Sequence, residues 1–260
     1  HLGVYRKKIG DEIGWLRTGF EGAQDYDFTL RFTEKTKSIG HIPKILYHWR
    51  ERKESTAINP EAKGYIVEAA KKAKTEALER RGYSAELEWV SNIYQFRVNY
   101  KAVGNPLVSI IIPSKDNYEV LCRCISSLVE KTEYKNYEII LVDNGSSNDA
   151  KSKYETLVDR YRIQYIYEPM DFNFSRMCNI GAHKAKGEVL LFLNDDIEIL
   201  DGDWLANMVG HAQVPYTGAV GAKLLYPDKD SIQHIGIINI KNGPVHPFAG
   251  YTDKSTYYFN

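Results

Sequence analysis

One stretch of the chain places an unbroken hydrophobic run directly before a cluster of acids. Residues 189–193 are all apolar, and Asn194-Asp195-Asp196 follows at once. An apolar run of this length is typical of a parallel strand covered on both faces. Open α/β sheets bind ligands at the carboxyl ends of such strands, and carboxylates there suit Mg²⁺ or Mn²⁺ together with a substrate phosphate. The alternative is a polar turn that merely ends a core strand.

The hydrophobic pattern from Pro106 onward alternates between the strand period and the helix period. The predicted strands are residues 107–112, 138–142, 162–167 and 189–193, and the predicted helices are residues 118–130, 148–161 and 174–185. Strands and helices that alternate with short connections are typical of a mostly parallel sheet with helices on both faces. The predicted fold class is therefore α/β.

The first 106 residues follow a different pattern. Residues 61–81 are rich in Ala, Lys and Glu around an apolar stripe, so we predict a helix that ends at Gly82. Residues 86–100 alternate enough to form one or two strands or an extended linker. Residues 20–28 place acids among aromatics before a predicted helix, and residues 42–47 are predicted to form a short strand.

Composition and charge exclude several classes of protein. The 260 residues carry 34 Lys and Arg against 34 Asp and Glu, with the charges interspersed, so no basic stripe indicates a nucleic-acid partner. No apolar run approaches the roughly 20 residues that span a bilayer, and no signal peptide is visible. Three cysteines, Cys122, Cys124 and Cys178, lack the spacing of a disulfide framework or a zinc site and are interpreted as small core residues or inert thiols in a reducing compartment. A chain that begins at His1 is expected to be a fragment.

Three strand ends carry polar residues that together resemble one known family. The matching phrases are VSIIIP at 108–113, YEIILVDNGS at 137–146, FNFS at 172–175 with Asn179, GEVLLFLNDDIE at 187–198 and DWL at 203–205. As a set they resemble the family-2 glycosyltransferases and cover about residues 107–260. The resemblance implies a GT-A fold, nucleotide-sugar binding and metal-dependent, inverting transfer of a sugar to a glycan acceptor.

The first 50 residues resemble a different part of the same family. Residues 20–31 resemble the acceptor-side segment that carries the catalytic base, and residues 42–50 resemble the closing strand and tail of the catalytic domain. In the family these segments follow the metal motif, whereas here they precede it. The chain is therefore predicted to be an internal fragment of a tandem two-module bacterial polysaccharide glycosyltransferase: the end of a first module at 1–57, a connector at 58–106 and the start of a second module at 107–260.

The two partial modules are complementary halves of one fold. Each half alone is expected to expose apolar surface, so we hypothesise that residues 1–50 dock onto residues 107–260, within one chain or across a homodimer that exchanges half-modules. Without such docking, the alternative to an active enzyme is a catalytically incomplete nucleotide-binding or scaffold fragment.

The resemblance implies a metal site and a donor site. Asp196, helped by Asp195, is the implied metal ligand, and Asn194 stands where the family often has a further aspartate, which is expected to weaken metal affinity. His48 is a further candidate for the metal or the diphosphate. The residues implied to bind the donor are Pro113, Ser114, Asp116, Asp143, Asn144, Asn173, Arg176, Asn179 and Asp195. For Arg176, an exposed position on a helix is the alternative.

The resemblance also implies a general base. Asp25 is the candidate, because a carboxylate beside the attacking hydroxyl can accept its proton, and Asp27 is the alternative. The structural interpretation of Asp25 is a helix N-cap. His234 and His246 lie after the metal motif, where acceptor contacts are expected, although a hydrogen-bonded structural role is favoured for each.

Other enzyme classes fit the pattern less well. A nucleotidyltransferase typically has a Gly-rich loop with Arg or Lys after the first strand, and residues 113–117 lack it. A Rossmann oxidoreductase needs G-x-G-x-x-G at the same place, and none is there. The implied donor is a UDP-sugar or dTDP-sugar, and the implied acceptor is a glycan or lipid-linked glycan. The implied location is the cytoplasm or the inner face of the bacterial membrane.

Overall fold

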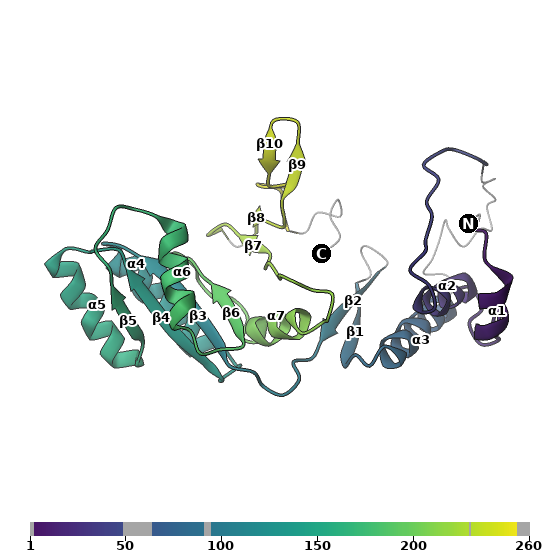
Figure 1. The fold of residues 1–260 in the computed structure, drawn as a ribbon, viewed down its shortest axis with the longest axis horizontal. Coiled ribbons are helices and arrows are strands. Elements are labelled where there is room, and N and C mark those ends of the chain that lie inside the picture. The colour runs from purple at the N-terminus through teal and green to yellow at the C-terminus, as the bar shows by residue number, and fades with distance from the viewer. Residues whose placement is uncertain (1–2, 49–63, 91–94, 229, 254–260) are drawn as a thin grey trace. The chain divides into compact units, whose positions relative to one another are not determined.

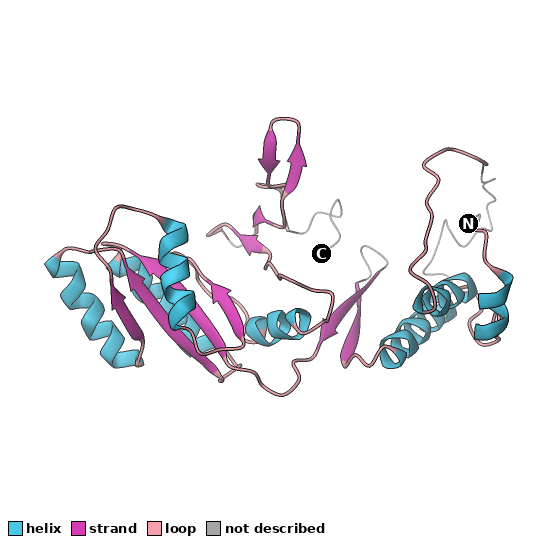
Figure 2. Ribbon diagram, in the orientation of Figure 1, coloured by secondary structure: helices cyan, strands magenta, loops and turns pink. Residues whose placement is uncertain are grey.

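The chain divides into two compact units with the boundary between Asn99 and Tyr100. The computed structural model describes residues 3–48, 64–90, 95–228 and 230–253. The boundary falls within the segment predicted to be a connector, and the predicted module limits stay a prediction. Each unit is described by itself below (Figures 1 and 2).

The second unit is built on a four-stranded parallel sheet. Its strands are β3 (Val108–Ser114), β4 (Tyr137–Asp143), β5 (Gln164–Tyr167) and β6 (Val189–Phe192). They lie in the order β5-β4-β3-β6, and every neighbouring pair is parallel. This arrangement confirms the predicted α/β fold class, and all four predicted strands are present.

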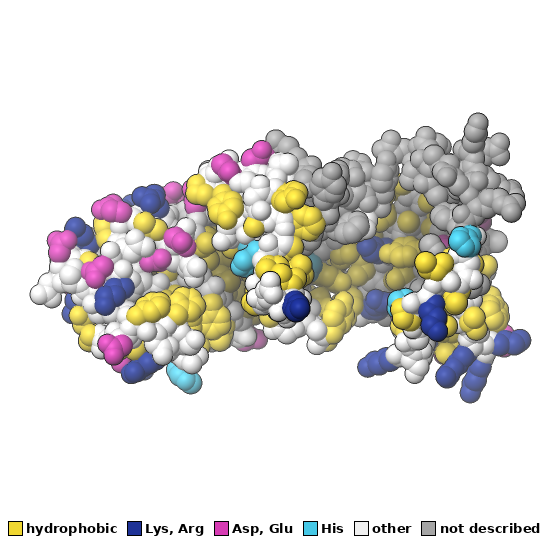
Figure 3. All heavy atoms as spheres, turned by 90° about the horizontal axis from the view of Figure 1, so that it is seen from above, with side chains coloured by type: hydrophobic (Ala, Val, Ile, Leu, Met, Phe, Trp, Pro, Cys, Tyr) yellow, Lys and Arg dark blue, Asp and Glu magenta, His cyan; other side chains and the backbone are white. Residues whose placement is uncertain are grey.

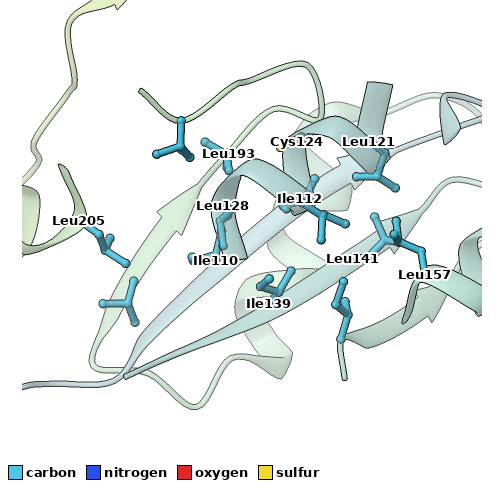
Figure 4. Packing of buried hydrophobic residues seen from close by; sticks show 14 of the residues in the cluster. Ile110, Ile112, Leu121, Cys124, Leu128, Ile139, Leu141, Leu157, Leu193 and Leu205 are labelled. Carbon is cyan, nitrogen blue, oxygen red and sulfur yellow. The ribbon is translucent and has the colours of Figure 1, made fainter. Parts of the chain in front are cut away.

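Helices cover both faces of this sheet. They are α4 (Tyr118–Lys131), α5 (Asn148–Tyr161), α6 (Phe174–Lys184) and α7 (Trp204–Ala212). Successive strand residues point to opposite faces. Ile110 and Ile112 therefore pack with Leu121 and Leu128 of α4 (Figure 4), whereas Ile111 packs on the opposite face in a cluster that includes Met177 of α6. The first three helices match their predicted ranges closely; α7 was not predicted.

The prediction that the strand before the acidic cluster is covered on both faces is wrong. β6 is an edge strand, and its residues alternate between half-buried and exposed. Leu190 and Phe192 are 43% and 52% exposed, because α6 packs against β3 and β4 rather than over β6. The strands that are covered on both faces are β3, which is buried throughout, and most of β4.

The chain after α7 forms short antiparallel pairs instead of extending the parallel sheet. They are β7 (Leu224–Leu225) with β8 (Ile232–His234), and β9 (Ile238–Ile240) with β10 (Gly243–Val245). His234 and His246 meet here, with their Nδ1 atoms 2.7 Å apart. This contact gives each histidine a hydrogen-bond partner, as the structural interpretation expects.

The described residues of the first unit form three helices and a two-stranded sheet. The elements are α1 (Lys7–Ile13), α2 (Gln24–Glu34), α3 (Gly64–Arg80), β1 (Ala85–Val90) and β2 (Gln95–Tyr100), whose last residue lies beyond the unit boundary. The predicted helices correspond to α2 and α3, which pack against each other. The predicted strand at residues 42–47 is wrong: those residues are exposed and form no strand, because no described strand pairs with them.

Charges of both signs lie close together on the surface. Over the part of the second unit around α5, acidic and basic side chains are interspersed on the face shown in Figure 3. Lys153 and Asp149, for example, form an ion pair of 2.8 Å one turn apart on α5. Within the described ranges, no helix has both the length and the apolar character needed to cross a bilayer.

Candidate functional site

The polar residues that follow the parallel strands gather at one edge of the sheet. β3 ends at Ser114 and β4 ends at Asp143, and these two residues are register partners. After β6, the backbone N of Leu193 donates to the carbonyl of Ile111 over 3.0 Å and so continues the ladder. Because the carboxyl ends of parallel strands share an edge, the acidic cluster after Leu193 reaches the same edge as Ser114.

Two donors hold the side chain of Asp195 at this edge. The Ser114 hydroxyl donates to Asp195 Oδ2 over 2.7 Å, and the Asn117 amide Nδ2 donates to the same oxygen over 3.1 Å. Asp195 is half-buried, and in the part of the chain that the structure describes its other oxygen, Oδ1, has no hydrogen-bond partner. The structure therefore brings together two residues that were predicted to bind the donor, Ser114 and Asp195.

The acidic pair has the chemistry of a hard-cation site. Asp196 is exposed beside Asp195, and the free Oδ1 of Asp195 leaves oxygen ligands available on both residues. Mg²⁺ is commonly held by one or two carboxylates plus substrate phosphates and water, so the two residues fit such an ion. Among the described residues, no group of three or more His, Cys, Asp or Glu side chains is arranged to hold a metal ion by itself.

Asp143 is occupied in closing the turn after β4. Its side chain is fully buried, and Oδ1 accepts hydrogen bonds from the backbone N and the hydroxyl of Ser146, at 2.8 and 2.7 Å. Oδ2 accepts from the Tyr165 hydroxyl at 2.5 Å. Burial, followed by this bond to Asp143, raises the pKa of Tyr165, so the phenol keeps its proton. A ligand contact through the Asp143 carboxylate needs one of these bonds to break or to be shared.

Asn144, the next residue, is held by its backbone rather than by its side chain. Its backbone N donates to the carbonyl of Ser114 over 3.0 Å, which ties the ends of β3 and β4 together. The side chain is fully buried, yet neither Nδ2 nor Oδ1 has a hydrogen-bond partner among the residues that the structure describes. An unsatisfied buried polar group typically costs about 1–3 kcal/mol, so a bound ligand or water is the expected partner.

The loop after β3 is fixed to the loop after β4. The backbone N of Asp116 donates to Ser146 Oγ over 2.9 Å, and Asp116 Oδ1 accepts from the backbone N of Ser147 over 2.8 Å. The hydrogen bond from Ser147 lowers the pKa of Asp116, which keeps this exposed carboxylate charged. Pro113 lies three residues before Asp116, buried inside β3 opposite Val142.

The predicted donor residues on α6 stand at its start. Asn173 caps the helix, because its Oδ1 accepts a hydrogen bond of 2.9 Å from the backbone N of Arg176. The Arg176 guanidinium is exposed and lies 3.5 Å from Glu168 Oε1. The backbone N of Glu168 donates to the Asp143 carbonyl over 2.8 Å, which links this helix start to the end of β4. Asn179 is exposed further along α6.

The candidate base residues lie in the first unit, on α2. Asp25 is exposed, and its Oδ1 accepts a bond of 2.8 Å from the backbone N of Tyr26. Asp27 is fully buried between Arg17 and Arg31, both of which donate to its carboxylate. Burial acts to raise the pKa of Asp27, but the two guanidinium groups outweigh it and lower the pKa.

His48 also lies in the first unit. It is exposed and belongs to the segment that forms no helix or strand. Asp25, Asp27 and His48 thus belong to one unit, and the acidic pair belongs to the other.

Sequence reasoning missed two residues of the hydrogen-bond network around Asp195, Asn117 and Tyr154. This tyrosine is fully buried on α5, and its hydroxyl lies 2.8 Å from Ser114 Oγ and 2.9 Å from the backbone N of Asn117. The pattern of α5 indicates only a polar helix. No local signal marks a tyrosine whose partners lie 37 and 40 positions away in the sequence.

Comparison with known proteins agrees with the motifs. The family model for Glycosyl transferase family 2 matches residues 109–255. The chain is 40% identical over 250 residues to the O-antigen biosynthesis protein RfbC of Myxococcus xanthus, covering 95% of this chain and 19% of that protein. It is 32% identical over 125 residues to a GalNAc(5)-diNAcBac-PP-undecaprenol beta-1,3-glucosyltransferase of Campylobacter jejuni, covering 46% of this chain and 39% of that protein.

A solved structure gives a weaker likeness. The mannosyltransferase PcManGT from Pyrobaculum calidifontis, in complex with GDP-Man and Mn²⁺, shares 18% identity with a TM-score of 0.44, covering 65% of this chain and 48% of that one. The chain therefore spans less than half the length of each of these three proteins. The family match, in contrast, covers the sheet, the loops at its carboxyl edge and the acidic pair. On that match, the chain belongs to glycosyl transferase family 2.

Proposed function

We propose that the second unit binds a nucleoside-diphosphate sugar through a divalent cation, and that the chain takes part in transferring the sugar to a glycan acceptor. The observation that carries this proposal is the acidic pair: Asp195 is oriented by Ser114 and Asn117 while its Oδ1 stays free beside the exposed Asp196. Family membership supports sugar transfer. The name of the Myxococcus relative supports a role in bacterial surface polysaccharide synthesis.

The acidic pair would hold Mg²⁺ or Mn²⁺, which acts as a Lewis acid on the leaving diphosphate. Asn194, which stands before the pair, adds no charge to it. The guanidinium of Arg176 is a candidate for the phosphate groups, because its contact with Glu168 is long and exposed. Arg is well suited to phosphate, since it offers several donors in one plane.

The unpaired amide of Asn144 is our candidate for the nucleobase. An amide donates from Nδ2 and accepts at Oδ1, which complements a base edge that presents a carbonyl next to an N–H group. Uracil, thymine and guanine all present this pair, so UDP-sugar, dTDP-sugar and GDP-sugar donors all fit. Asn144 is closed off from solvent, so a base reaches it only when the neighbouring loop shifts.

For the general base we assign Asp25 in preference to Asp27. Inverting transfer needs a carboxylate that accepts the proton of the acceptor hydroxyl as that hydroxyl attacks in line with the leaving group. Asp27 is a poor proton acceptor, because two ion pairs occupy its oxygens and lower its pKa. Asp25 is exposed, and among the described residues it accepts only a local backbone bond. His48, in the same unit, remains a candidate for the diphosphate.

A nucleotide-binding fragment without turnover of its own is the second candidate function. It is favoured by the division of the candidate base and the acidic pair between two units. It is also favoured by the 19% of the Myxococcus relative that the chain spans. Under this proposal the chain is a slice of a tandem enzyme, and either a neighbouring module or a second copy in a homodimer supplies the missing half.

The acceptor and the location follow from the same proposal. The acceptor is a glycan or a lipid-linked glycan, and the Campylobacter relative, whose name includes an undecaprenol-linked glycan, supports the second form. A lipid-linked acceptor would place the enzyme at the inner face of the bacterial membrane as a peripheral protein.

Thermal unfolding in the presence of ligands tests the proposal. The chain is unfolded with Mn²⁺ and UDP, dTDP or GDP, in parallel with Asp196→Asn. A ligand that binds only the native state at a hundredfold excess over its dissociation constant adds about 2.7 kcal/mol of stability. We expect a Mn²⁺-dependent upward shift with one of these nucleotides that is absent in Asp196→Asn.

The matched control is Asp201→Asn, which removes an exposed aspartate five positions further along. This variant should keep the full shift. A shift that persists in Asp196→Asn contradicts the assigned metal site, and the absence of any shift with wild-type chain contradicts the donor site as a whole. Turnover of the matching nucleotide sugar then separates the enzyme from the binding fragment.

A further inference from the structure

A chain of hydrogen bonds runs from α5 to the acidic pair. The Tyr154 hydroxyl is fully buried and lies 2.8 Å from Ser114 Oγ and 2.9 Å from the backbone N of Asn117. Ser114 and Asn117 in turn donate to Asp195 Oδ2. One buried phenol therefore touches both of the residues that orient this carboxylate.

The direction of each hydrogen bond follows from the chemistry of the groups. An ionised carboxylate only accepts, so the single proton of the Ser114 hydroxyl points to Asp195. The Ser114 oxygen is then left as an acceptor, and the Tyr154 hydroxyl must donate to it. The Tyr154 oxygen accepts from the backbone N–H of Asn117, because an N–H group can only donate. The bonds from Asn117 N through Tyr154 and Ser114 to Asp195 thus all point the same way, an arrangement in which each bond strengthens the next.

The protonated state of Tyr154 is secured by its surroundings. Burial raises the pKa of this phenol, so it carries its proton at neutral pH and can donate to Ser114. Its ring packs within the core cluster formed by the sheet, α4 and α5, which fixes the position of the hydroxyl. A rigid core residue thereby sets the orientation of a carboxylate at the surface of the site.

We infer that Tyr154 is a positioning residue for metal binding: through Ser114 and Asn117 it holds Asp195 Oδ2, so that Oδ1 is presented to the cation. This inference rests on the proposed function of the acidic pair. Groups that orient a metal ligand from behind typically change metal affinity by about 10–100-fold when they are removed. Tyr154 does not touch the cation or the donor in this arrangement.

The test measures the binding of Mn²⁺ to the whole chain without nucleotide. The concentration of free Mn²⁺ is determined from its electron paramagnetic resonance signal. Tyr154→Phe removes the hydroxyl and keeps the ring, and we expect the dissociation constant for Mn²⁺ to rise about tenfold. Asn117→Ala removes the second donor to Asp195 and should act in the same direction. The side chain of Asn117 makes no capping hydrogen bond to α4, so Asn117→Ala should keep the start of this helix. The variant therefore gives a measurement of Mn²⁺ affinity even if Tyr154→Phe does not fold.

Tyr161→Phe is the matched control. Tyr161 lies on the same helix, and its hydroxyl is 3.2 Å from Ser126 Oγ, away from the acidic pair. It should lose a comparable hydrogen bond yet bind Mn²⁺ as the wild type does. In Tyr154→Phe, Mn²⁺ at about ten times the wild-type concentration should restore the nucleotide-dependent thermal shift, a rescue that damage to folding alone does not give.

The outcomes separate this inference from the proposed function. If wild type and both variants bind Mn²⁺ equally, the positioning role is overturned and the metal site stands. If Tyr161→Phe weakens binding as much as Tyr154→Phe, the effect comes from α5 in general, and the inference is again overturned. If the wild type binds no Mn²⁺ either without or with nucleotide, the proposed function fails and this inference fails with it.

Discussion

At the scale of single residues, Asp25 and Asp27 show how two carboxylates on one helix turn can differ in chemistry. Asp25 faces solvent, whereas Asp27 is buried and bonded to Arg17 and Arg31. Arg31 is itself only 7% exposed and also donates to the carbonyls of Ile13 and Trp15. Asp27 therefore joins α2 to the loop after α1, which is a structural role.

This difference gives a prediction from two matched variants. Asp27→Asn leaves buried Arg31 with one fewer charge partner and should destabilise the first unit by about 3 kcal/mol, since breaking a buried ion pair typically costs 3–5 kcal/mol. Asp25→Asn should change stability by less than about 1 kcal/mol, the usual scale of an exposed charge near a helix start. If Asp25 is the base, Asp25→Asn should nonetheless abolish sugar transfer. Hydrogen exchange of peptides from α2 measures the first effect, and a transfer assay measures the second.

The ion pairs of Asp27 also predict a pH dependence. Its folded-state pKa is lowered, so the carboxylate contributes stability at pH values above its unfolded pKa, which is about 3.9. That contribution is lost as the pH falls through the lower, folded-state pKa. Protection of α2 against hydrogen exchange should therefore fall in acid in the wild type, and Asp27→Asn should remove this part of the pH dependence. Equal acid sensitivity of both proteins would contradict the assignment.

Asn144 gives a prediction in which stability and binding move in opposite directions. Asn144→Leu replaces the unpaired buried amide by an apolar side chain of similar size, so the free protein should become more stable by about 1–2 kcal/mol. The same change should remove the thermal shift caused by nucleotide, because the base loses its partner. A variant that keeps the full nucleotide shift would show that Asn144 does not contact the base.

At the scale of elements, the turn after β4 positions much of the site, and Gly145 permits it. Gly145 has a φ of 78°, and an added Cβ would lie 2.8 Å from the Cα of Pro169. Gly145→Ala should therefore destabilise the second unit by about 1–3 kcal/mol, the scale of a strained backbone position. Gly218→Ala is the control, because that exposed glycine has no positive φ and an added Cβ meets nothing within 4 Å. Urea unfolding of the two variants, side by side, measures the difference.

The elements that the sequence predicted well are those whose signal is local. The helices α4, α5 and α6 follow from apolar periodicity and turn residues, and the strands β3 and β4 follow from continuous apolar runs. The exposure of β6 was not predictable in the same way. Its apolar run looks like a covered strand, and only the sheet order shows that α6 lies over β3 and β4 instead.

The site shows the same limit. Ser114 and Asp195 were predictable as neighbours, because strand ends in a parallel sheet share an edge. That Asp143 is occupied while Asn144 is unpaired depends on Tyr165 and Ser146, and no sequence pattern fixes where those hydroxyls point. The role of Tyr154 could not be predicted from the sequence for the same reason.

At the scale of the whole molecule, both units carry apolar surface that each leaves uncovered. In the second unit this surface is the face of β6 on which Leu190 and Phe192 are exposed. In the first unit it is the segment that forms no strand, where Ile42, Ile45 and Leu46 are exposed. An edge strand with unpaired backbone groups can accept a further strand, and an exposed apolar segment that forms no strand of its own can supply it.

We therefore predict that the chain associates through these surfaces, with the segment around Ile42 of one copy placed along β6 of another. Light scattering after size-exclusion chromatography should show a dimer that dissociates on dilution. Phe192→Lys should give a monomer, because a charged side chain on this face opposes strand addition. Tyr216→Lys, at a loop position that is 74% exposed, should leave the dimer intact.

The alternative is docking of the same two surfaces within one chain, and the experiment distinguishes it. Intramolecular docking gives a monomer at every concentration, and Phe192→Lys then raises the hydrogen exchange of residues 42–47 without changing the mass. A wild-type monomer in which residues 42–47 exchange at the same rate with and without Phe192→Lys would exclude both forms of docking. In that case the candidate base on α2 and the acidic pair would not complete one another, and the chain would act as the donor-binding part of a larger enzyme.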